Sequence, residues 1–337
     1  ANRLFLLNLA AIYTTGFECP DTTRVLPELK EMTEAVAGIY TAYNQSFPHM
    51  PLSKEYLDLY GKMNGFIDKQ GASFDDFDHF TFIRDYVNPL FAINQAQIRQ
   101  YQLYSANFND YSLTNSSHSI FEKDLFRAQN SKGIYSMIDD PALLDEIRHT
   151  GKLLFYDPLI SGNNKRSCAS CHKPTEYFTD TTRLTALQFD GQHVLPRNTP
   201  SLVNVIYNHL LMLDGHHYTL QQQALEVMQK PDEMNGRAED IIDKVMSCKE
   251  YKRTFRKLLK YTPEEKQLSL DHIASAITYY YAGFSQFSAP FDDAMNQKQS
   301  VSEDVKNGFN LFMGKARCGT CHFVPVFNGV KPPYISS

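Results

Sequence analysis

The chain has 337 residues, of which 42% are apolar and 21% are charged, and its formal net charge is −5. A chain of this length and composition folds into two or three globular domains with a sizeable core. The mildly acidic balance argues against nucleic acid as a partner, because binding to phosphates requires clustered Lys and Arg. The sequence has no run of 18 or more apolar residues, so it predicts no membrane-spanning helix.

The first apolar stretch of the chain is Leu4–Tyr13, which is short and contains Asn8. It admits two interpretations, the apolar part of an export signal or the first packed helix of the fold. The sequence begins with Ala1 instead of methionine, which suits a chain whose export signal has been removed. We therefore predict a packed helix at this position.

Helical periodicity runs through most of the remaining chain. Apolar residues recur at positions i, i+3, i+4 and i+7, and strand signals are nearly absent. This spacing predicts helices over 26–43, 56–70, 238–259 and 270–284. Clusters of Pro, Gly, Asn and Asp predict loops at 48–51, 157–164 and 190–200. The predicted fold class is all-α.

Two pentapeptides, Cys168–His172 and Cys318–His322, read C-A-S-C-H and C-G-T-C-H and use four of the six cysteines. Both fit the C-x-x-C-H pattern that attaches a c-type haem. Residues three and four apart lie on one face of a helical turn, so both sulfurs of a motif can meet one edge of a porphyrin. The histidine that follows the second cysteine then lies under the iron as an axial ligand.

The motifs therefore predict two covalently bound haem c groups, with His172 and His322 as iron ligands. The thioether bonds would be made by Cys168, Cys171, Cys318 and Cys321. Two other interpretations of the same spacing remain open, a zinc site and a C-x-x-C redox pair. A zinc site that used both motifs would require segments 150 residues apart to converge.

Covalent haem also predicts where the protein works. Because haem c is attached outside the cytoplasm, the expected location is the bacterial periplasm. The protein would be free there or anchored to the membrane through a removed N-terminal segment.

The positions of the motifs suggest three parts of the chain. Residues 1–140 are rich in Tyr and Phe, contain no haem motif and are predicted to form a helical N-terminal extension. Residues 141–265 would form the first cytochrome c-like haem domain, and residues 266–337 would begin a second one. Only 15 residues follow His322, so we expect this second domain to be incomplete, or closed by a segment from elsewhere.

Several motifs follow one another in a recognisable order from Leu153 onward. They are LLFYDPLISGNNKRSCASCH, RNTPSLVNV, LDG followed by LQQQA, APFD, and GFNLFMGKARCGTCHFVPVF. As an ordered set, they resemble the bacterial dihaem cytochrome c peroxidase family, which also contains the MauG-type dihaem oxidases. The resemblance covers about 185 residues, from Leu153 to the end, and leaves the N-terminal extension without a counterpart.

The resemblance implies a division of labour between the two haems. The haem on His172 would reduce hydrogen peroxide to water. The haem on His322 would accept electrons from a small donor protein such as a monohaem cytochrome c or a cupredoxin. A homodimer is a candidate assembly.

The loop between the first motif and RNTP contains further candidate site residues. The resemblance implies that His193 is a distal iron ligand that leaves the iron on activation, although a loop histidine that faces solvent is the simpler interpretation. Arg197 would bind a haem propionate or fix its own loop. Asn198 matches the family asparagine that helps to bind calcium.

The chain departs from the family where a catalytic glutamate is expected, because Gln221 and Gln222 stand there instead. Glutamine cannot exchange a proton near neutral pH and is a poor acid–base group. His216 or His217 could replace it, since imidazole titrates in the useful range; alternatively, both are exposed histidines that precede a helix. The chain has no tryptophan, so a tryptophan relay between the haems cannot be carried over.

Other sulfur-containing residues are predicted to be structural. Met295 and Met313 would fill the core, which leaves the distal ligand of the second iron unassigned. Cys19 and Cys248 could form a disulfide in an oxidising compartment, but we expect unpaired buried thiols.

These observations leave three functions to compare. The first is a periplasmic dihaem peroxidase. The second is a dihaem electron-transfer or sensing protein without peroxidase activity, which the two glutamines favour. The third is a MauG-like oxidase that acts on another molecule through its haem.

Overall fold

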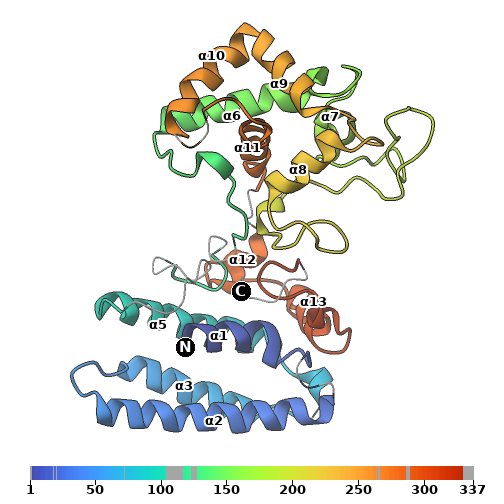
Figure 1. Ribbon diagram of the computed structural model, residues 1–337. Coiled ribbons are helices and arrows are strands. Elements are labelled where there is room, and N and C mark those ends of the chain that lie inside the picture. Colours follow the sequence, from blue (N-terminus) through green and yellow to red (C-terminus); the bar gives the residue numbers. More distant parts are fainter. Residues whose placement is uncertain are drawn as a thin grey trace. The chain divides into compact units, whose positions relative to one another are not determined.

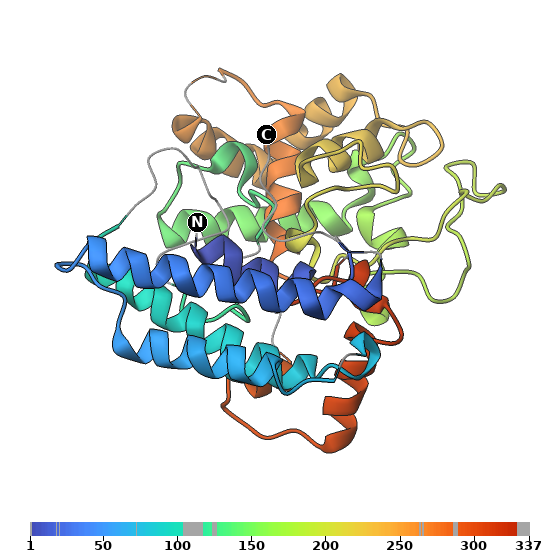
Figure 2. The ribbon, with the colours of Figure 1, turned by 90° about the horizontal axis from the view of Figure 1, so that it is seen from below.

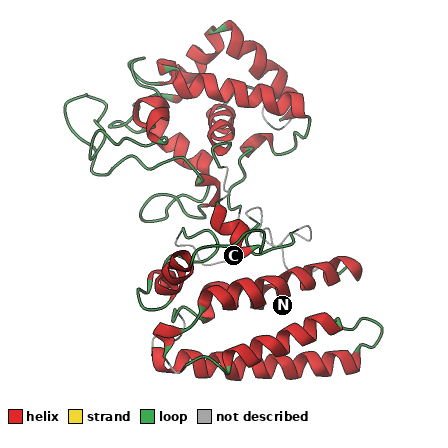
Figure 3. Ribbon diagram, turned by 180° about the vertical axis from the view of Figure 1, so that it is seen from behind, coloured by secondary structure: helices red, strands yellow, loops and turns green. Residues whose placement is uncertain are grey.

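The computed structural model describes residues 2–17, 19, 21–71, 73–103, 117–122, 127–262, 264, 266–285 and 289–328. Every regular element in these ranges is helical, and β pairing is limited there to isolated bridges (Figure 3). The all-α prediction is therefore confirmed. None of the described helices combines the length and the apolar character needed to cross a bilayer.

The chain forms two compact units. Unit 1 comprises Ala1–Arg127 and Ser288–Ser337, and unit 2 comprises Ala128–Phe287. This division differs from the expected three parts, because the segment with the second haem motif folds with the N-terminal extension. Residues 329–337, which belong to the segment expected to be too short to close a haem domain, lie outside the described residues.

Unit 1 begins with a buried helical segment. Helix α1 spans Asn2–Asn8 and continues as a π-helical turn, η1, over Leu9–Tyr13. Leu6, Leu7 and every residue from Leu9 to Ile12 are buried. The predicted packed first helix is confirmed, and its apolar side chains belong to the core of unit 1.

Two helices, α2 at Thr22–Ser46 and α3 at Lys54–Ile67, run side by side in unit 1 (Figure 1). Each begins at a capping side chain, since Asp21 accepts from an amide of the first turn of α2 and Ser53 does the same for α3. Tyr40 meets Tyr60 edge to face, with ring centroids 5.1 Å apart, and this contact joins the two helices. The chain continues through η2 Phe74–Asp76, α4 His79–Thr81, η3 Phe82–Val87 and α5 Asn88–Gln100.

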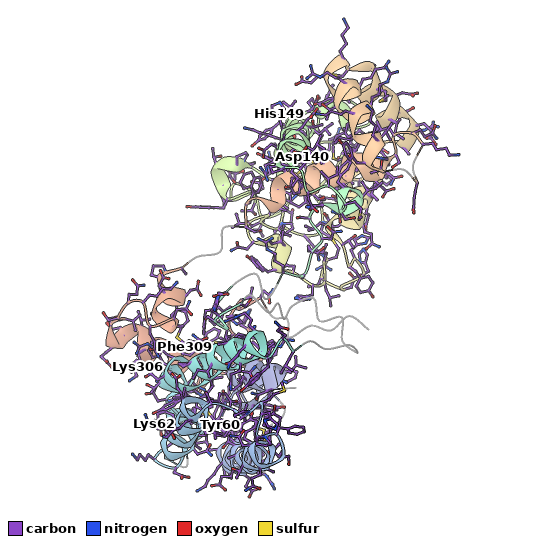
Figure 4. All side chains as sticks on the ribbon, turned by 90° about the vertical axis from the view of Figure 1, so that its left-hand side faces the viewer. Tyr60, Lys62, Asp140, His149, Lys306 and Phe309 are labelled. Carbon is purple, nitrogen blue, oxygen red and sulfur yellow. The ribbon has the colours of Figure 1, made fainter. Side chains whose placement is uncertain are left out.

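The C-terminal helices of unit 1, α12 at Pro290–Met295 and α13 at Glu303–Met313, pack on the segment around α4. The Phe80 amide donates to Asn310 Oδ1 at 2.8 Å, and the Phe80 ring meets that of Phe309 with centroids 6.1 Å apart. Figure 4 labels Phe309 together with Lys306, whose Nζ lies 3.3 Å from a carboxylate oxygen of Asp78. These contacts explain why the second motif belongs to unit 1.

Both methionines that were predicted to fill the core are buried. Met295 lies at the end of α12 and Met313 at the end of α13. The space beside Met313 is so tight that a Cβ at Gly319, inside the second motif, would lie 2.8 Å from its sulfur. The core role predicted for these two residues is therefore confirmed.

Unit 2 is built around helix α11, Leu270–Ala282. Figure 1 shows α11 end-on between α6 and α8, and Figure 2 shows it from the side. The other α-helices of this unit are α6 Pro141–Tyr156, α7 Cys168–Cys171, α8 Leu220–Gln229, α9 Ala238–Ser247 and α10 Lys249–Leu258. Short helical turns are η5 Gly133–Tyr135, η6 Pro158–Ile160, η7 Pro174–Glu176, η8 Val205–Tyr207 and η9 Leu259–Tyr261.

The closest packing in unit 2 is between α6 and α11. A Cβ added at Gly151 would lie only 1.9 Å from the carbonyl oxygen of Ala276. Glycine thus allows the two backbones to touch, and α11 is tied to the first haem motif and not to the second. This contact accounts for the boundary at residue 287 instead of the expected 265.

One predicted helix is wrong in its length. Residues 238–259 form two helices, because Cys248 leaves the helical conformation with ψ of 122° and ends α9 before α10 begins. Cys248 is a half-buried free thiol, as is Cys19 in unit 1. Both were expected to be buried, and the structure corrects this.

We expect Gly151→Ala to destabilise the protein by about 1–3 kcal/mol, because the new methyl group must push α6 away from α11. Urea unfolding followed by circular dichroism measures this change. Gly308→Ala is the control, since its Cβ meets nothing within 4 Å on helix α13. That variant should be neutral or stabilised by up to about 1 kcal/mol. Equal stability of the two variants would contradict the proposed close packing.

A second stability prediction concerns His79, which is buried with no hydrogen-bond partner at either ring nitrogen. Burial lowers its pKa to about 3. Below pH 6.5, His79 therefore binds a proton in the unfolded chain but not in the folded chain. The free energy of unfolding falls as the pH drops from 6.5 towards 3.

We expect His79→Phe to remove part of this acid sensitivity. Between pH 6 and pH 4 the wild type should lose up to about 1.4 kcal/mol per pH unit more than the variant. Urea unfolding of both proteins at several pH values measures the difference. Parallel pH profiles would show that His79 is not the group responsible.

Candidate functional site

Each C-x-x-C-H motif forms a single helical turn. In unit 2 the motif is helix α7, and the His172 amide donates to the Cys168 carbonyl at 2.9 Å. In unit 1 the motif begins as η10, Cys318–Thr320, and the His322 amide donates to the Cys318 carbonyl at 2.8 Å. The predicted arrangement, with both cysteines and the histidine on one turn, is present twice.

Both motif histidines are held in the same way by a backbone carbonyl. His172 Nδ1 lies 3.0 Å from the Phe178 oxygen, and His322 Nδ1 lies 3.0 Å from the Phe327 oxygen. A carbonyl only accepts hydrogen bonds, so in each ring Nδ1 carries a proton and donates it to this oxygen. Iron-binding histidines are commonly oriented by such a second hydrogen bond.

The two carbonyls come from residues with an uncommon backbone conformation. Phe178 has φ of 56° and Phe327 has φ of 59°, both in the left-handed region. Phe178 is further fixed by stacking on Phe284, with ring centroids 3.8 Å apart. The sequence signal was a proline followed by a phenylalanine after each motif, in HKPTEYF and HFVPVF, and our sequence analysis did not use it.

The protonation of the first motif suits a haem ligand better than a redox thiol pair. Burial lowers the pKa of His172, so the ring stays neutral and keeps its lone pair. Burial raises the pKa of Cys168 to about 12 and also raises that of Cys171. Reactive C-x-x-C pairs depend on a lowered thiol pKa, and this motif has the opposite.

The described residues also bear on the zinc interpretation. Among them, neither cysteine pair joins a cluster of three His, Cys, Asp or Glu side chains that could hold a metal ion. Unit 2 does expose large apolar side chains in the loops that follow its motif, at Leu184, Val194, Leu210 and Leu213. A porphyrin offers apolar surface to such side chains, so the residues present fit a haem.

The structure places His193 on an exposed loop. Its side chain is 74% exposed, and its Nδ1 lies 2.5 Å from Asp190 Oδ2. This hydrogen bond, together with two backbone amides, lowers the pKa of Asp190 to about 2. Arg197 and Asn198 are exposed in the same loop. A distal-ligand role for His193, a propionate role for Arg197 and a calcium role for Asn198 stay predictions.

Gln221 and Gln222 hold helix α8 in place. Gln221 Nε2 donates to Thr278 Oγ1 at 2.9 Å and to the Asn130 carbonyl at 3.1 Å. Gln222 Oε1 accepts from the Thr219 amide at 3.2 Å and forms a capping box with that residue. Both side chains are therefore already used in hydrogen bonds within unit 2.

The acidic residue that the sequence analysis missed is Glu226, one helical turn after Gln222. Its carboxylate accepts hydrogen bonds from the ring nitrogens of His216 and His217. The hydrogen bonds from His216 and His217 lower the pKa of Glu226. The hydrogen bonds of His216 to Glu226 and to Asp214 raise the pKa of His216. The spacing of four residues was the available signal, since it puts Glu226 and Gln222 on one helix face.

Comparisons with known proteins bear on the region that contains the first motif. Residues 146–300 match the family described as di-haem cytochrome c peroxidase. Over these residues the chain is similar to the dihaem cytochrome c peroxidase and MauG family, whose members are expected to use haem as a cofactor.

The relatives are similar over a limited part of their length. The methylamine utilization protein MauG of Methylorubrum extorquens is 32% identical over 51% of this chain and 48% of that protein. Cytochrome c551 peroxidase of Pseudomonas aeruginosa is 29% identical over 53% of this chain and 50% of that protein. The chain thus spans about half the length of the curated relatives that it matches.

One solved structure is similar to part of the chain. A MauG-like protein associated with microbial copper homeostasis is 28% identical and covers 56% of each chain, with a TM-score of 0.49.

We expect Cys168→Ser combined with Cys171→Ser to reduce the covalent haem content from two per chain to one. Intact mass and a pyridine haemochrome spectrum measure this, on protein exported with haem-attachment machinery. The matched control is Cys19→Ser combined with Cys248→Ser, which should retain both haems. Retention of two covalent haems in the first variant would contradict the assignment of the motif.

Proposed function

We propose that this protein is a periplasmic dihaem c-type peroxidase that reduces hydrogen peroxide with electrons from a small donor protein. The observation that carries the proposal is the pair of C-x-x-C-H turns in which a backbone carbonyl holds Nδ1 of His172 and of His322. The match of residues 146–300 to the di-haem cytochrome c peroxidase family supports it, as does the similarity to a cytochrome c551 peroxidase. When bound, the haems would supply the redox chemistry for a two-electron reduction.

The chain's own residues would divide the remaining work. Cys168, Cys171, Cys318 and Cys321 would hold the porphyrins. His193 would act as the gate at the first haem, and its exposed loop and its hydrogen bond to Asp190 are compatible with a side chain that swings away. Arg197 would bind a propionate, and Asn198 would contribute to a calcium site.

Proton exchange is the part of this proposed mechanism in which the chain departs from the resemblance. Because Gln221 and Gln222 cannot titrate, we assign the exchange to His216, whose raised pKa and contact with Glu226 suit an acid–base group. Gln221 and Gln222 would then be positioning residues. They would hold helix α8 in place, so that its Glu226 stays in contact with His216.

The alternative function is electron transfer or sensing without peroxidase activity. The specific observation in its favour is that both glutamines are used in structural hydrogen bonds where the family has an acidic residue. A MauG-like oxidase is a third candidate function, since similar proteins include the methylamine utilization protein MauG of two organisms.

The test adds hydrogen peroxide to the half-reduced dihaem protein and follows the haem spectrum and peroxide consumption. The peroxidase proposal predicts a rapid spectral change and sustained turnover with a reduced cytochrome or an artificial donor. His193→Ala should respond to peroxide without prior half-reduction, because the gate would be absent.

Two results would overturn the proposal. Two haems without peroxide consumption would favour electron transfer. A spectral change with turnover only when a second oxidisable substrate is present would favour the MauG-like oxidase.

A further inference from the structure

We propose that His216, His217 and Glu226 form a binding site for a divalent transition-metal ion of the zinc type. The three ligand atoms, one from each side chain, lie within 4.8 Å of one another, and this is the only such group among the described residues. The inference uses no haem residue, but it takes His216, the residue to which the peroxidase proposal assigns proton exchange.

Two imidazole rings and one carboxylate group lie close together in this cluster. His216 Nε2 lies 3.1 Å from Glu226 Oε2, and His217 Nε2 contacts the same oxygen. The two imidazole rings are adjacent, with centroids 4.2 Å apart. Small movements of the side chains would replace these hydrogen bonds with bonds to one shared ion.

A fourth residue orients the first ligand. His216 Nδ1 lies 2.5 Å from Asp214 Oδ1, so a carboxylate fixes the outer nitrogen while Nε2 points to Glu226. Carboxylate–histidine–metal arrangements of this kind are common behind metal ligands, where they set the tautomer and make the imidazole a stronger donor. A histidine that only faced solvent would not need carboxylates at both ring nitrogens.

The backbone around the cluster is well defined by local structure. The Leu211 amide donates to the His217 carbonyl at 2.9 Å, and these residues form an isolated antiparallel bridge that closes the loop carrying both histidines. Thr219 and Gln222 cap helix α8, which places Glu226 one turn inside that helix. The His217 side chain is only 16% exposed, whereas that of His216 is 43% exposed. The site thus has a buried side and an open side.

The donor set selects the class of ion. Two imidazole nitrogens and one carboxylate oxygen match the three protein ligands of many zinc sites, with a fourth position left for water or another ligand. Mg²⁺ and Ca²⁺ prefer sets made of oxygen alone, so we do not expect either to bind here. The ion would occupy the nitrogen that proton exchange at His216 requires, and the two roles therefore exclude one another.

The competing interpretation is a purely structural role. In that case the same hydrogen bonds only hold the loop at 209–218 against helix α8. Both interpretations predict that the cluster supports the loop, so loss of stability on mutation cannot separate them. Selective retention of a metal ion does.

The experiment measures zinc retention by the dihaem protein. Protein dialysed against a chelator is equilibrated with Zn²⁺, dialysed again and analysed for zinc and iron by mass spectrometry. We expect one zinc per two irons in the wild type, which gives an internal standard through the haem iron. Titration calorimetry with Zn²⁺, and separately with Mg²⁺, then gives the affinity of each ion.

The variants and their control are matched. Glu226→Gln keeps the size of the side chain and removes its charge, while His217→Ala removes the most buried ligand. Asp214→Asn leaves all three ligands and should weaken zinc binding about ten- to a hundredfold, as expected for an orienting partner. His193→Ala is the control, because it removes a histidine from another His–Asp pair at 2.5 Å without touching the cluster.

Three outcomes would overturn the inference. These are no zinc above background in the wild type, equal zinc retention in Glu226→Gln and wild type, or loss of zinc in His193→Ala to the same degree. If His217→Ala fails to fold, Glu226→Gln and Asp214→Asn still decide the question, because both preserve the shape of the site. Binding of Mg²⁺ as tight as that of Zn²⁺ would also contradict the proposed class of ion.

Discussion

The constraint on which both functional centres depend is the single helical turn that joins two cysteines to a histidine. The amide of the histidine closes that turn on the first cysteine, so the three side chains share one face. A carbonyl from a left-handed phenylalanine then fixes the ring, at Phe178 in one unit and Phe327 in the other. The same two local features, repeated in separate units, thus orient each histidine.

The packing of the helices decides which segment accompanies each motif. In unit 2 the contact of α6 with α11 at Gly151 brings a helix from beyond residue 265 onto the first motif. In unit 1 the N-terminal extension packs on α13 through Phe80 and Asn310. The extension, which had no counterpart in the family resemblance, therefore acts as the structural support of the second motif.

Helix α8 of unit 2 carries both structural amides and a carboxylate. Gln221 and Gln222 stabilise α8, and the carboxylate appears one turn later at Glu226, in contact with two histidines. The helix on which the sequence indicated a loss of acid–base capacity thus also carries a glutamate that contacts two histidines. Proton exchange and metal binding would use the same nitrogen of His216, so the two proposed roles exclude one another there.

The sequence by itself determined the features that arise from neighbouring residues. The C-x-x-C-H spacing, the all-α class, the packed helix at Leu4–Tyr13 and the core methionines follow from periodicity and from residues three or four apart. Only the tertiary structure decided which segments meet. The contact at Gly151, the break at Cys248 and the meeting of His216 with Glu226 depend on backbone turns and long-range packing, whose energies are not encoded in any single short stretch.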